Sequence, residues 1–232
     1  MIILEIQKVD LASFCYLNKN RYPFLLESVN HNDNNRYSIL FAFPSESIIL
    51  NNLSDFDFLN ELENQYKSSN LNSSLPFLGC WFVYLSYELI GQIEPILSRE
   101  LHTSELPISY AVKIPSAIII DHQSDTTYLI DKDSDQSRID TILKDIELIK
   151  PIPKESILGE LSQENEDKFI KGVKACLDYI VAGDVFQVNL SREWKYKLTK
   201  EIDSAIIYHA LKNANPAPFS ALIQYANFSI VS

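Results

Sequence analysis

The polar side chains most suited to chemistry stand on an apolar stretch, residues 179–194, which reads YIVAGDVFQVNLSREW. Its second half, residues 185–190, predicts a strand with Gln187 and Asn189 on the face opposite Phe186 and Val188. If that strand is buried, both carboxamides must find hydrogen-bond partners. Spacing alone favours the alternative, a strand with one solvated face.

The element before this strand reads as an amphipathic helix that begins near Asn165. Its apolar residues recur at three- and four-residue spacing, and opposite charges lie four residues apart on the other face, as in Asp167 with Lys171 and Lys174 with Asp178. Gly183 follows where a helix end needs a residue that is free to take positive φ. The predicted apolar stripe consists of Phe169, Val173, Cys176, Leu177 and Ile180.

No familiar catalytic motif accompanies these elements: GxSxG, the P-loop, GxGxxG and HExxH are all absent from the sequence. The acidic pairs Glu164/Glu166 and Asp131/Asp133 fall in loops or helix starts, so we expect them to be solvated. We expect the scattered histidines to be surface or satisfied core residues rather than ligands. They are His31, His102, His122 and His209.

Cysteine usage points to a reducing compartment. Cys15, Cys80 and Cys176 are odd in number and far apart, which fits neither a metal-ligand spacing nor a disulfide framework. We therefore expect buried, reduced thiols in a cytoplasmic protein.

The charge balance narrows the classes of partner. The chain has 232 residues and a formal net charge of −11, with a pI near 4.8. Such acidity argues against nucleic-acid or anionic-membrane partners, and an anionic substrate would need a local cation or a metal. The start of the chain does not read as a signal peptide, and no apolar run approaches the length of a membrane span.

The pattern along the chain predicts an α+β fold in which antiparallel sheets pack in a sandwich with outer helices. Residues 31–36 read as a polar turn. We expect 37–43 and 47–50 to form consecutive antiparallel strands, and 111–120 with 126–130 to form a hairpin. Other strands are expected at 1–7, from residue 77 and in a hairpin of 219–225 with 228–231, and helices at 10–16, 55–66, 137–148 and 204–212.

The expected domains are residues 1–150, a proline-containing linker at 151–162, and an incomplete second domain at 163–232. The sequence stops at Ser232 inside apparent strand sequence. On that basis the chain is expected to be a truncated part of a longer protein.

Four separated stretches resemble the chorismate-utilising enzymes, the family of anthranilate synthase component I and aminodeoxychorismate synthase component I. Their order and distances match the family over nearly the whole chain, which makes the resemblance far more specific than any one motif. The stretches are residues 24–28 (FLLES), 76–79 (PFLG) with Tyr84 and 87–89 (YEL), 182–192 (AGDVFQVNLSR) and 215–221 (NPAPFSA).

Within the family, QVNLSREW and APFSAL resemble the aminodeoxychorismate branch, whereas LLES is typical of the anthranilate branch. Cys80 and Val83 depart from positions where the family prefers glycine, which puts the local backbone path in doubt.

The resemblance implies an enzyme that replaces a ring hydroxyl of chorismate with ammonia, supplied by a glutaminase subunit (component II). In the branch favoured here, the product is 4-amino-4-deoxychorismate for para-aminobenzoate and folate synthesis. Magnesium would neutralise the substrate carboxylates. The family's catalytic carboxylates, metal ligands and nucleophilic lysine belong to motifs that would lie beyond residue 232, so no catalytic residue is assigned here.

The resemblance also implies a tryptophan-binding pocket, in which backbone groups and a serine hydroxyl hold the zwitterion and apolar walls hold the indole. In the alternative interpretation, Phe219 and Ile39 only pack a domain interface. The pocket residues carried over are Ser28, Arg36, Tyr37, Ser38, Ile39, Pro218, Phe219 and Ser220.

Other functions stay open on the sequence alone. The chain could belong to anthranilate synthase component I of tryptophan synthesis, or be a non-catalytic amino-acid-binding regulatory module. The pairing of LLES with APFS counts against isochorismate and salicylate synthases, which lack the amino-acid pocket.

Overall fold

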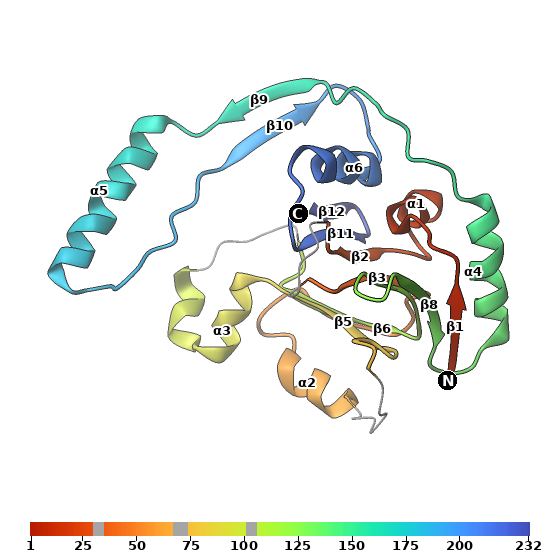
Figure 1. Cartoon of the computed structure of the whole chain (residues 1–232). Helices are drawn as coiled ribbons and strands as arrows, with labels where there is room; N and C mark the ends of the chain where they lie inside the picture. The colour runs from red at the N-terminus through yellow and green to blue at the C-terminus, as the bar shows by residue number, and fades with distance from the viewer. Residues whose placement is uncertain (30–34, 67–73, 101–105) are drawn as a thin grey trace. The chain divides into compact units, whose positions relative to one another are not determined.

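The computed structural model describes residues 1–29, 35–66, 74–100 and 106–232 (Figure 1). The chain divides into two compact units: Met1–Lys154 with Asp203–Ser232, and Glu155–Ile202. Most of the polar turn expected at 31–36 therefore lies outside the described residues, as do His31 and His102.

The larger unit is built on an antiparallel sheet, which has seven strands among the described residues. Two hairpins are present in it: residues 116–121 pair with 126–131, and residues 220–225 pair with 228–231. Across the sheet, the order is β1 (Ile2–Ile6), β8 (Thr126–Asp131), β7 (Ser116–Asp121), β3 (Tyr37–Ala42), β2 (Phe24–Glu27), β11 (Ser220–Tyr225) and β12 (Phe228–Val231).

A second antiparallel sheet packs against one face of the first. It contains β4 (Ser47–Leu50), β6 (Ser109–Ile114) and β5 (Cys80–Leu85) in that order. Aromatic side chains fill the space between the sheets: the rings of Phe24 and Phe82 stack with centroids 4.1 Å apart, and both side chains are buried. The predicted α+β sandwich is therefore confirmed.

Helices cover the outside of this sandwich. In Figure 1, α1 (Leu11–Leu17) and α6 (Ser204–Ala214) lie together over β2 and β11. The side chains of Asp57, Asp135 and Asp203 accept backbone N–H groups at the first turns of their helices and so fix where each one begins. The remaining helices of this unit are α2 (Phe58–Gln65), α3 (Ile90–Ile93), α4 (Gln136–Leu148) and the short 3-10 turns η1 (Tyr87–Leu89) and η2 (Pro95–Glu100).

Two strand predictions for this unit are wrong. The apolar run 111–120 is divided by Pro115 between β6 and β7, which belong to different sheets, because proline cannot donate to a continuous ladder. Strands β3 and β4 are consecutive in sequence but do not pair with each other. Phe43, at φ 58°, and Pro44 turn the chain out of the first sheet between them.

The smaller unit contains the antiparallel pair β9 (Gly159–Gln163) and β10 (Trp194–Leu198), and the helix α5 (Glu166–Ala182). Gly183 ends α5 at φ 82°, which confirms the predicted left-handed cap. The strand predicted at 185–190 is wrong for this structure: the segment is irregular and the strand begins at Trp194. The described residues give 185–190 no neighbouring strand to pair with.

The compact units cut across the expected linear division into residues 1–150, 151–162 and 163–232. α6, β11 and β12 belong to the larger unit because β11 pairs with β2, and β9 begins within the expected linker. The sequence domains themselves remain a prediction. Among the described residues, no helix is both long and apolar enough to cross a bilayer.

Candidate functional site

A cavity of about 620 Å³ opens on the larger unit where β2, β3 and β11 lie side by side. This volume falls within the range of roughly 300–1,000 Å³ that is usual for small-molecule sites. It is lined by Leu26, Glu27, Ser28, Asn35, Arg36, Tyr37, Ile39, Phe219, Ser220, Ala221 and Ser232.

Strand register explains why these residues meet. Leu26 lies opposite Ile39 on one side and Ala221 on the other, so their side chains share one face of the sheet. Two residues further towards the cavity along each strand, the same alternation places Ser28, Tyr37 and Phe219 on that face. Two residues before Leu26, Phe24 lies on the same face and packs on Phe82 of the second sheet. The cavity therefore occupies the part of this face that lies beyond the interface between the sheets.

Six of the eight residues predicted for the amino-acid pocket line this cavity: Ser28, Arg36, Tyr37, Ile39, Phe219 and Ser220. Two do not. Ser38 is buried on the opposite face, where its Oγ accepts the backbone N–H of Ser28 at 3.0 Å and contacts Nε2 of His122 at 2.7 Å. Pro218 is exposed beside Phe219 and does not line the cavity.

The sequence interpretation missed two apolar wall residues, Leu26 and Ala221, as well as Asn35 and Ser232. Period-two alternation could have found the first two, since Leu26 stands two residues before Ser28 and Ala221 two residues after Phe219. The pairing of β2 with β11, which brings them together, carries no comparable signal in the sequence.

Hydrogen bonds fix the polar end of the cavity. Oγ of Ser28 donates to the carbonyl oxygen of Tyr37 at 2.9 Å. Nε and Nη2 of Arg36 donate to the two carboxylate oxygens of Asp121 at 2.8 and 2.6 Å. These hydrogen bonds hold the pKa of Asp121 well below its usual range. The Arg36 guanidinium also lies 4.8 Å from the centroid of the Tyr37 ring.

Glu27, which lies on β2 beside the cavity, forms hydrogen bonds to side chains of α6. Its carboxylate accepts from the Tyr208 hydroxyl at 2.6 Å and from Nζ of Lys212 at 2.8 and 2.9 Å. Burial, together with the nearby Glu27 charge, raises the pKa of the Tyr208 phenol. The Glu27 carboxylate is therefore committed to the helix side of the sheet and is not offered to a ligand.

The chemistry of the cavity suits binding better than bond making. Tyr37, Phe219, Leu26 and Ile39 form apolar walls, and Ser28 and Arg36 bring polar atoms to one end. Such a space fits a small amphipathic molecule with a flat apolar part. Within the described residues, no group of three or more His, Cys, Asp or Glu side chains could hold a metal ion.

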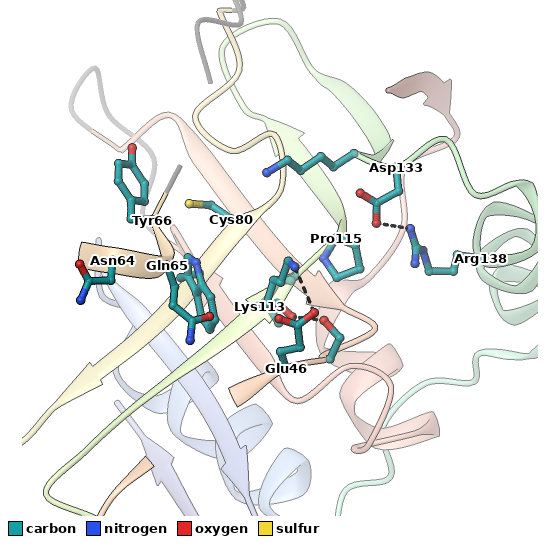
Figure 2. Close-up of a pocket in the computed structure, with 13 residues that line it drawn as sticks. Glu46, Asn64, Gln65, Tyr66, Cys80, Lys113, Pro115, Asp133 and Arg138 are labelled. Carbon is teal, nitrogen blue, oxygen red and sulfur yellow. Dashed lines mark hydrogen bonds and ion pairs between the residues drawn. The ribbon is translucent and has the colours of Figure 1, made fainter. Parts of the chain in front are cut away.

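A second cavity of about 620 Å³ lies at one end of the three-stranded sheet, near Trp81 and Lys132 (Figure 2). Figure 2 shows Lys113 directed at Glu46, with 3.2 Å between Nζ and Oε1, and Arg138 directed at Asp133, with 2.8 Å between Nη2 and Oδ2. Both of these cations are thus paired with acids. We take the first cavity as the candidate site because six of the residues predicted for a binding pocket line it.

Arg138 also corrects an expectation about acidic pairs. Asp131 is fully buried, accepting from Nε of Arg138 at 2.7 Å and from Oγ of Ser116 at 2.6 Å. The expectation that Asp131 is solvated is wrong, because β8 ends beneath α4, where Arg138 and Ser116 reach the Asp131 carboxylate. Its neighbour Asp133 is exposed, as expected.

The other residues that the sequence analysis singled out, two carboxamides and three thiols, do not form a functional site. Gln187 and Asn189 are exposed, which agrees with their solvated interpretation. The three thiols are unpaired, as expected, but only Cys15 is buried. The expectation of burial is wrong for Cys80 and Cys176, which stand on a strand at the rim of the second cavity and on α5.

Comparison with known proteins gives a consistent result. A sequence model of the family described as chorismate binding enzyme matches residues 22–232. The chain is 26% identical over 201 residues to an anthranilate synthase component I-like protein of Synechocystis, covering 84% of this chain and 41% of that protein. It is 29% identical over 167 residues to aminodeoxychorismate synthase component 1 of Bacillus subtilis, covering 67% of this chain and 35% of that protein.

A third relative, anthranilate synthase component 1 of Lactococcus lactis, is 25% identical over 238 residues, which cover 92% of this chain and 52% of that protein. The crystal structure of anthranilate synthase component I from Streptococcus pneumoniae has the same fold, with a TM-score of 0.69 at 20% identity over 88% of this chain and 51% of that one. The chain thus spans about half or less of the length of these proteins.

Proposed function

The chain belongs to the family of chorismate-binding enzymes, and from this premise we propose that it is the N-terminal part of the large subunit that aminates chorismate to 4-amino-4-deoxychorismate. The ammonia would come from a glutaminase partner, and the product would serve para-aminobenzoate and folate synthesis. The observation that carries this proposal is the family match over residues 22–232, read together with QVNLSREW and APFSAL.

The nearest alternative is the large subunit of anthranilate synthase. The relatives include proteins of both names, with identities of 29% and 25% that do not separate the branches. LLES at residues 25–28 favours the anthranilate branch, and the segment 187–194 favours the other. We give more weight to the aminodeoxychorismate branch because two separate stretches, 187–194 and 217–222, resemble it.

In this proposal the chain supplies binding surfaces rather than the reacting groups. A magnesium ion would neutralise the carboxylates of chorismate, but the described residues do not fit one, since no suitable cluster of ligands exists among them. We infer that the metal ligands and catalytic groups belong to the part of the relatives that this chain does not span.

The cavity between β2, β3 and β11 is the proposed site of a tryptophan-type amino acid. Its apolar walls would hold the indole, while Ser28, Arg36 and nearby backbone groups would hold the polar end. The support for this assignment is that six predicted residues, from three separate parts of the sequence, line one cavity of suitable volume.

A non-catalytic amino-acid-binding module is a second candidate function. It is favoured by the location of the cavity, which lies wholly within the larger unit and so requires nothing from residues 155–202. In that case the chain would bind the amino acid without any role in chorismate turnover.

Genetic complementation tests the enzymatic proposal. The full reading frame that encodes this chain should restore growth to a para-aminobenzoate auxotroph and not to an auxotroph that lacks anthranilate synthase. Rescue of the second strain alone would assign the anthranilate branch. Rescue of neither strain, by a frame that ends at residue 232, would favour the binding module.

The isolated 232-residue chain should be inactive. With chorismate, ammonium and magnesium, we expect no consumption of chorismate above the uncatalysed rate. Consumption is measured by the decrease in chorismate absorbance and by chromatography. A measurable enzymatic rate would contradict the inference that the reacting groups lie elsewhere.

A further inference from the structure

Two residues at the end of β7 contact the polar end of the cavity from behind. Asp121, the last residue of this strand, lies opposite Tyr37 in the pairing of β7 with β3, and it holds the guanidinium of Arg36. His122 follows, and its backbone N–H donates to the carbonyl oxygen of Arg36 at 2.8 Å. Neither Asp121 nor His122 lines the cavity itself. The end of β7 is thus fixed to residues that do line it.

The side chain of His122 reaches a second polar group of the cavity through a buried serine. Its Nε2 lies 2.7 Å from Oγ of Ser38, and the same Oγ accepts the backbone N–H of Ser28 at 3.0 Å. Ser38 is 0% exposed and Ser28 is 5% exposed, so the bond between the two serines is shielded from solvent. A chain of contacts therefore runs from His122, outside the cavity, to Ser28, which lines it.

The backbone of Ser28 depends on Ser38. Among the described residues, the register of β2 with β3 ends at Leu26 opposite Ile39, so pairing of these strands supplies no acceptor for the Ser28 N–H. Oγ of Ser38 supplies one instead, and a buried N–H without an acceptor would be costly. The Ser28 hydroxyl donates to the carbonyl oxygen of Tyr37 at 2.9 Å. Neighbouring residues of β3 thus fix both the backbone and the side chain of Ser28.

His122 helps to decide where the Ser38 hydroxyl lies. A serine side chain can take three staggered rotamers, and its oxygen can both accept and donate a hydrogen bond. At Ser38, contacts from two different parts of the sheet, Ser28 after β2 and His122 after β7, meet at this one oxygen. Without the imidazole, one of these contacts is lost and the other rotamers become easier to reach.

We propose that His122 and Ser38 are positioning residues for the amino-acid site. His122 holds the Ser38 hydroxyl and Ser38 holds the backbone of Ser28. The resulting place of the Ser28 hydroxyl sets the affinity for the polar end of the ligand. His122 and Ser38 act without touching the ligand, since neither lines the cavity. This inference rests on the proposed function, because the ligand is taken to be a tryptophan-type amino acid.

The competing interpretation is that the contact between Ser38 and His122 only stabilises the sheet. In that case, its loss would lower the free energy of unfolding and leave the affinity of the folded chain unchanged. If the pair positions Ser28, the affinity should fall in a chain that is still folded. A side chain that restores the hydrogen bond to Ser38 should then restore the affinity.

Two substitutions of His122 separate these interpretations. His122→Leu removes the hydrogen bond to Ser38 and keeps an apolar side chain in its place. His122→Gln brings an amide close to the position of Nε2 and can keep the bond. In isothermal titration with tryptophan, we expect His122→Leu to weaken binding about fivefold and His122→Gln by less than about twofold, since one hydrogen bond is at stake. Circular dichroism and urea denaturation confirm that each chain is folded.

A control and a double variant show where His122 acts. Gln123→Leu places the same apolar side chain one residue further on, where it is exposed, and should leave the affinity within about twofold of the wild type. If His122 acts through Ser28, a chain without the Ser28 hydroxyl should lose little more when His122 is replaced. The double variant Ser28→Ala with His122→Leu should then bind about tenfold more weakly, as we expect for Ser28→Ala alone, whereas independent effects would multiply to about fiftyfold.

A measurement without ligand tests the positioning itself. The amide proton of Ser28 is hydrogen-bonded to Ser38, so its exchange with solvent reports how firmly the Ser38 hydroxyl stays in place. The exchange is followed by NMR in the chain alone. We expect it to be at least about tenfold faster in His122→Leu than in the wild type, and within about twofold of the wild type in His122→Gln and Gln123→Leu.

Three results would overturn the proposal. The first is an unchanged affinity for tryptophan in folded His122→Leu. The second is an unchanged exchange rate of the Ser28 amide in that chain. The third is a loss of about fiftyfold in the double variant, which would show that His122 does not act through Ser28. If the wild type does not bind tryptophan, the proposed ligand is wrong, and the exchange of the Ser28 amide alone then decides whether His122 positions Ser28. The two failures are therefore distinguishable.

Discussion

At the scale of single residues, the structure depends on two carboxylates that are buried and bound by arginine. Asp131 and Asp121 are 0% and 3% exposed, and each receives two hydrogen bonds from a guanidinium group, of Arg138 and Arg36 respectively. A buried charge of this kind is costly unless its partners stay in place. The sequence does not reveal either pair: Asp121 and Arg36 are 85 residues apart, and Asp131 meets Arg138, seven residues on, only because α4 packs on β8.

Removing the charge of Asp131 should strongly destabilise the larger unit. Burial alone would raise the pKa of Asp131, but hydrogen bonds from Arg138 and Ser116 outweigh it and the pKa is lowered. Asp131→Asn leaves Arg138 without its buried partner, and we expect a loss of about 3–5 kcal/mol in the free energy of unfolding. Urea denaturation measures it. The control Asp133→Asn removes an exposed carboxylate and should cost less than about 1 kcal/mol; equal losses would contradict the account.

The Asp121–Arg36 pair predicts a specific response to acid. The folded pKa of Asp121 is lowered from its ordinary value of 3.8, so the pair contributes stability that is fully present above about pH 5 and lost as pH falls through the folded pKa. Asp121→Asn should therefore be less stable than the wild type at pH 7, with the difference shrinking at pH 3. A difference that is constant or grows on acidification, in urea titrations at both pH values, would contradict this.

At the scale of elements, contacts between strands decide what hydrophobic pattern alone leaves open. The helices predicted at 137–148 and 204–212 are present, because amphipathic spacing and aspartate caps are local signals. The helix predicted at 10–16 is present as Leu11–Leu17, without a side-chain cap. The run 111–120 looked like one strand until Pro115 divided it between two sheets. The run 185–190 has strand composition, but no strand among the described residues lies beside it. Pro115 is a local signal for the first of these breaks. The missing partner of 185–190 could not be predicted from its own residues, because pairing is a property of the whole chain.

The contact between the two sheets should depend on Phe82. Its ring stacks on Phe24 at 4.1 Å and meets Phe41 edge-on at 5.3 Å between ring centroids. Phe82→Ala should cost about 3–5 kcal/mol in urea denaturation, since it removes a buried ring and leaves a cavity. Tyr87 is 78% exposed near the same strand, and Tyr87→Ala should cost less than about 1 kcal/mol. A small loss for Phe82→Ala would show that the sheets do not pack as described.

At the scale of the whole molecule, the larger unit is assembled from two separated parts of the chain. Residues 203–232 complete a sheet whose other strands come from the first 154 residues, and β11 pairs directly with β2. The family resemblance was enough to propose the site residues. That Ser28 and Phe219 line one cavity, however, depends on the pairing of β2 with β11, which are far apart in the sequence.

This assembly predicts the outcome of limited proteolysis. Protease should cut first within residues 155–202, where no side chain is buried. After cutting there, the two products should remain together in size-exclusion chromatography, because β11, β12 and α6 stay packed on the first part of the chain. Separation of the products under native conditions would show that residues 203–232 do not belong to the larger unit.

The proposed site between β2, β3 and β11 should bind a tryptophan-type amino acid. Isothermal titration of the chain with tryptophan, comparing the wild type with Ser28→Ala, tests it most directly. The control Ser45→Ala removes an exposed hydroxyl from the second cavity.

We expect tryptophan to bind the wild type and the control equally, and to bind Ser28→Ala about tenfold more weakly, as the loss of one hydrogen bond worth about 1.4 kcal/mol requires. Binding that is absent in the wild type, or unchanged in a folded Ser28→Ala chain, would contradict the claim.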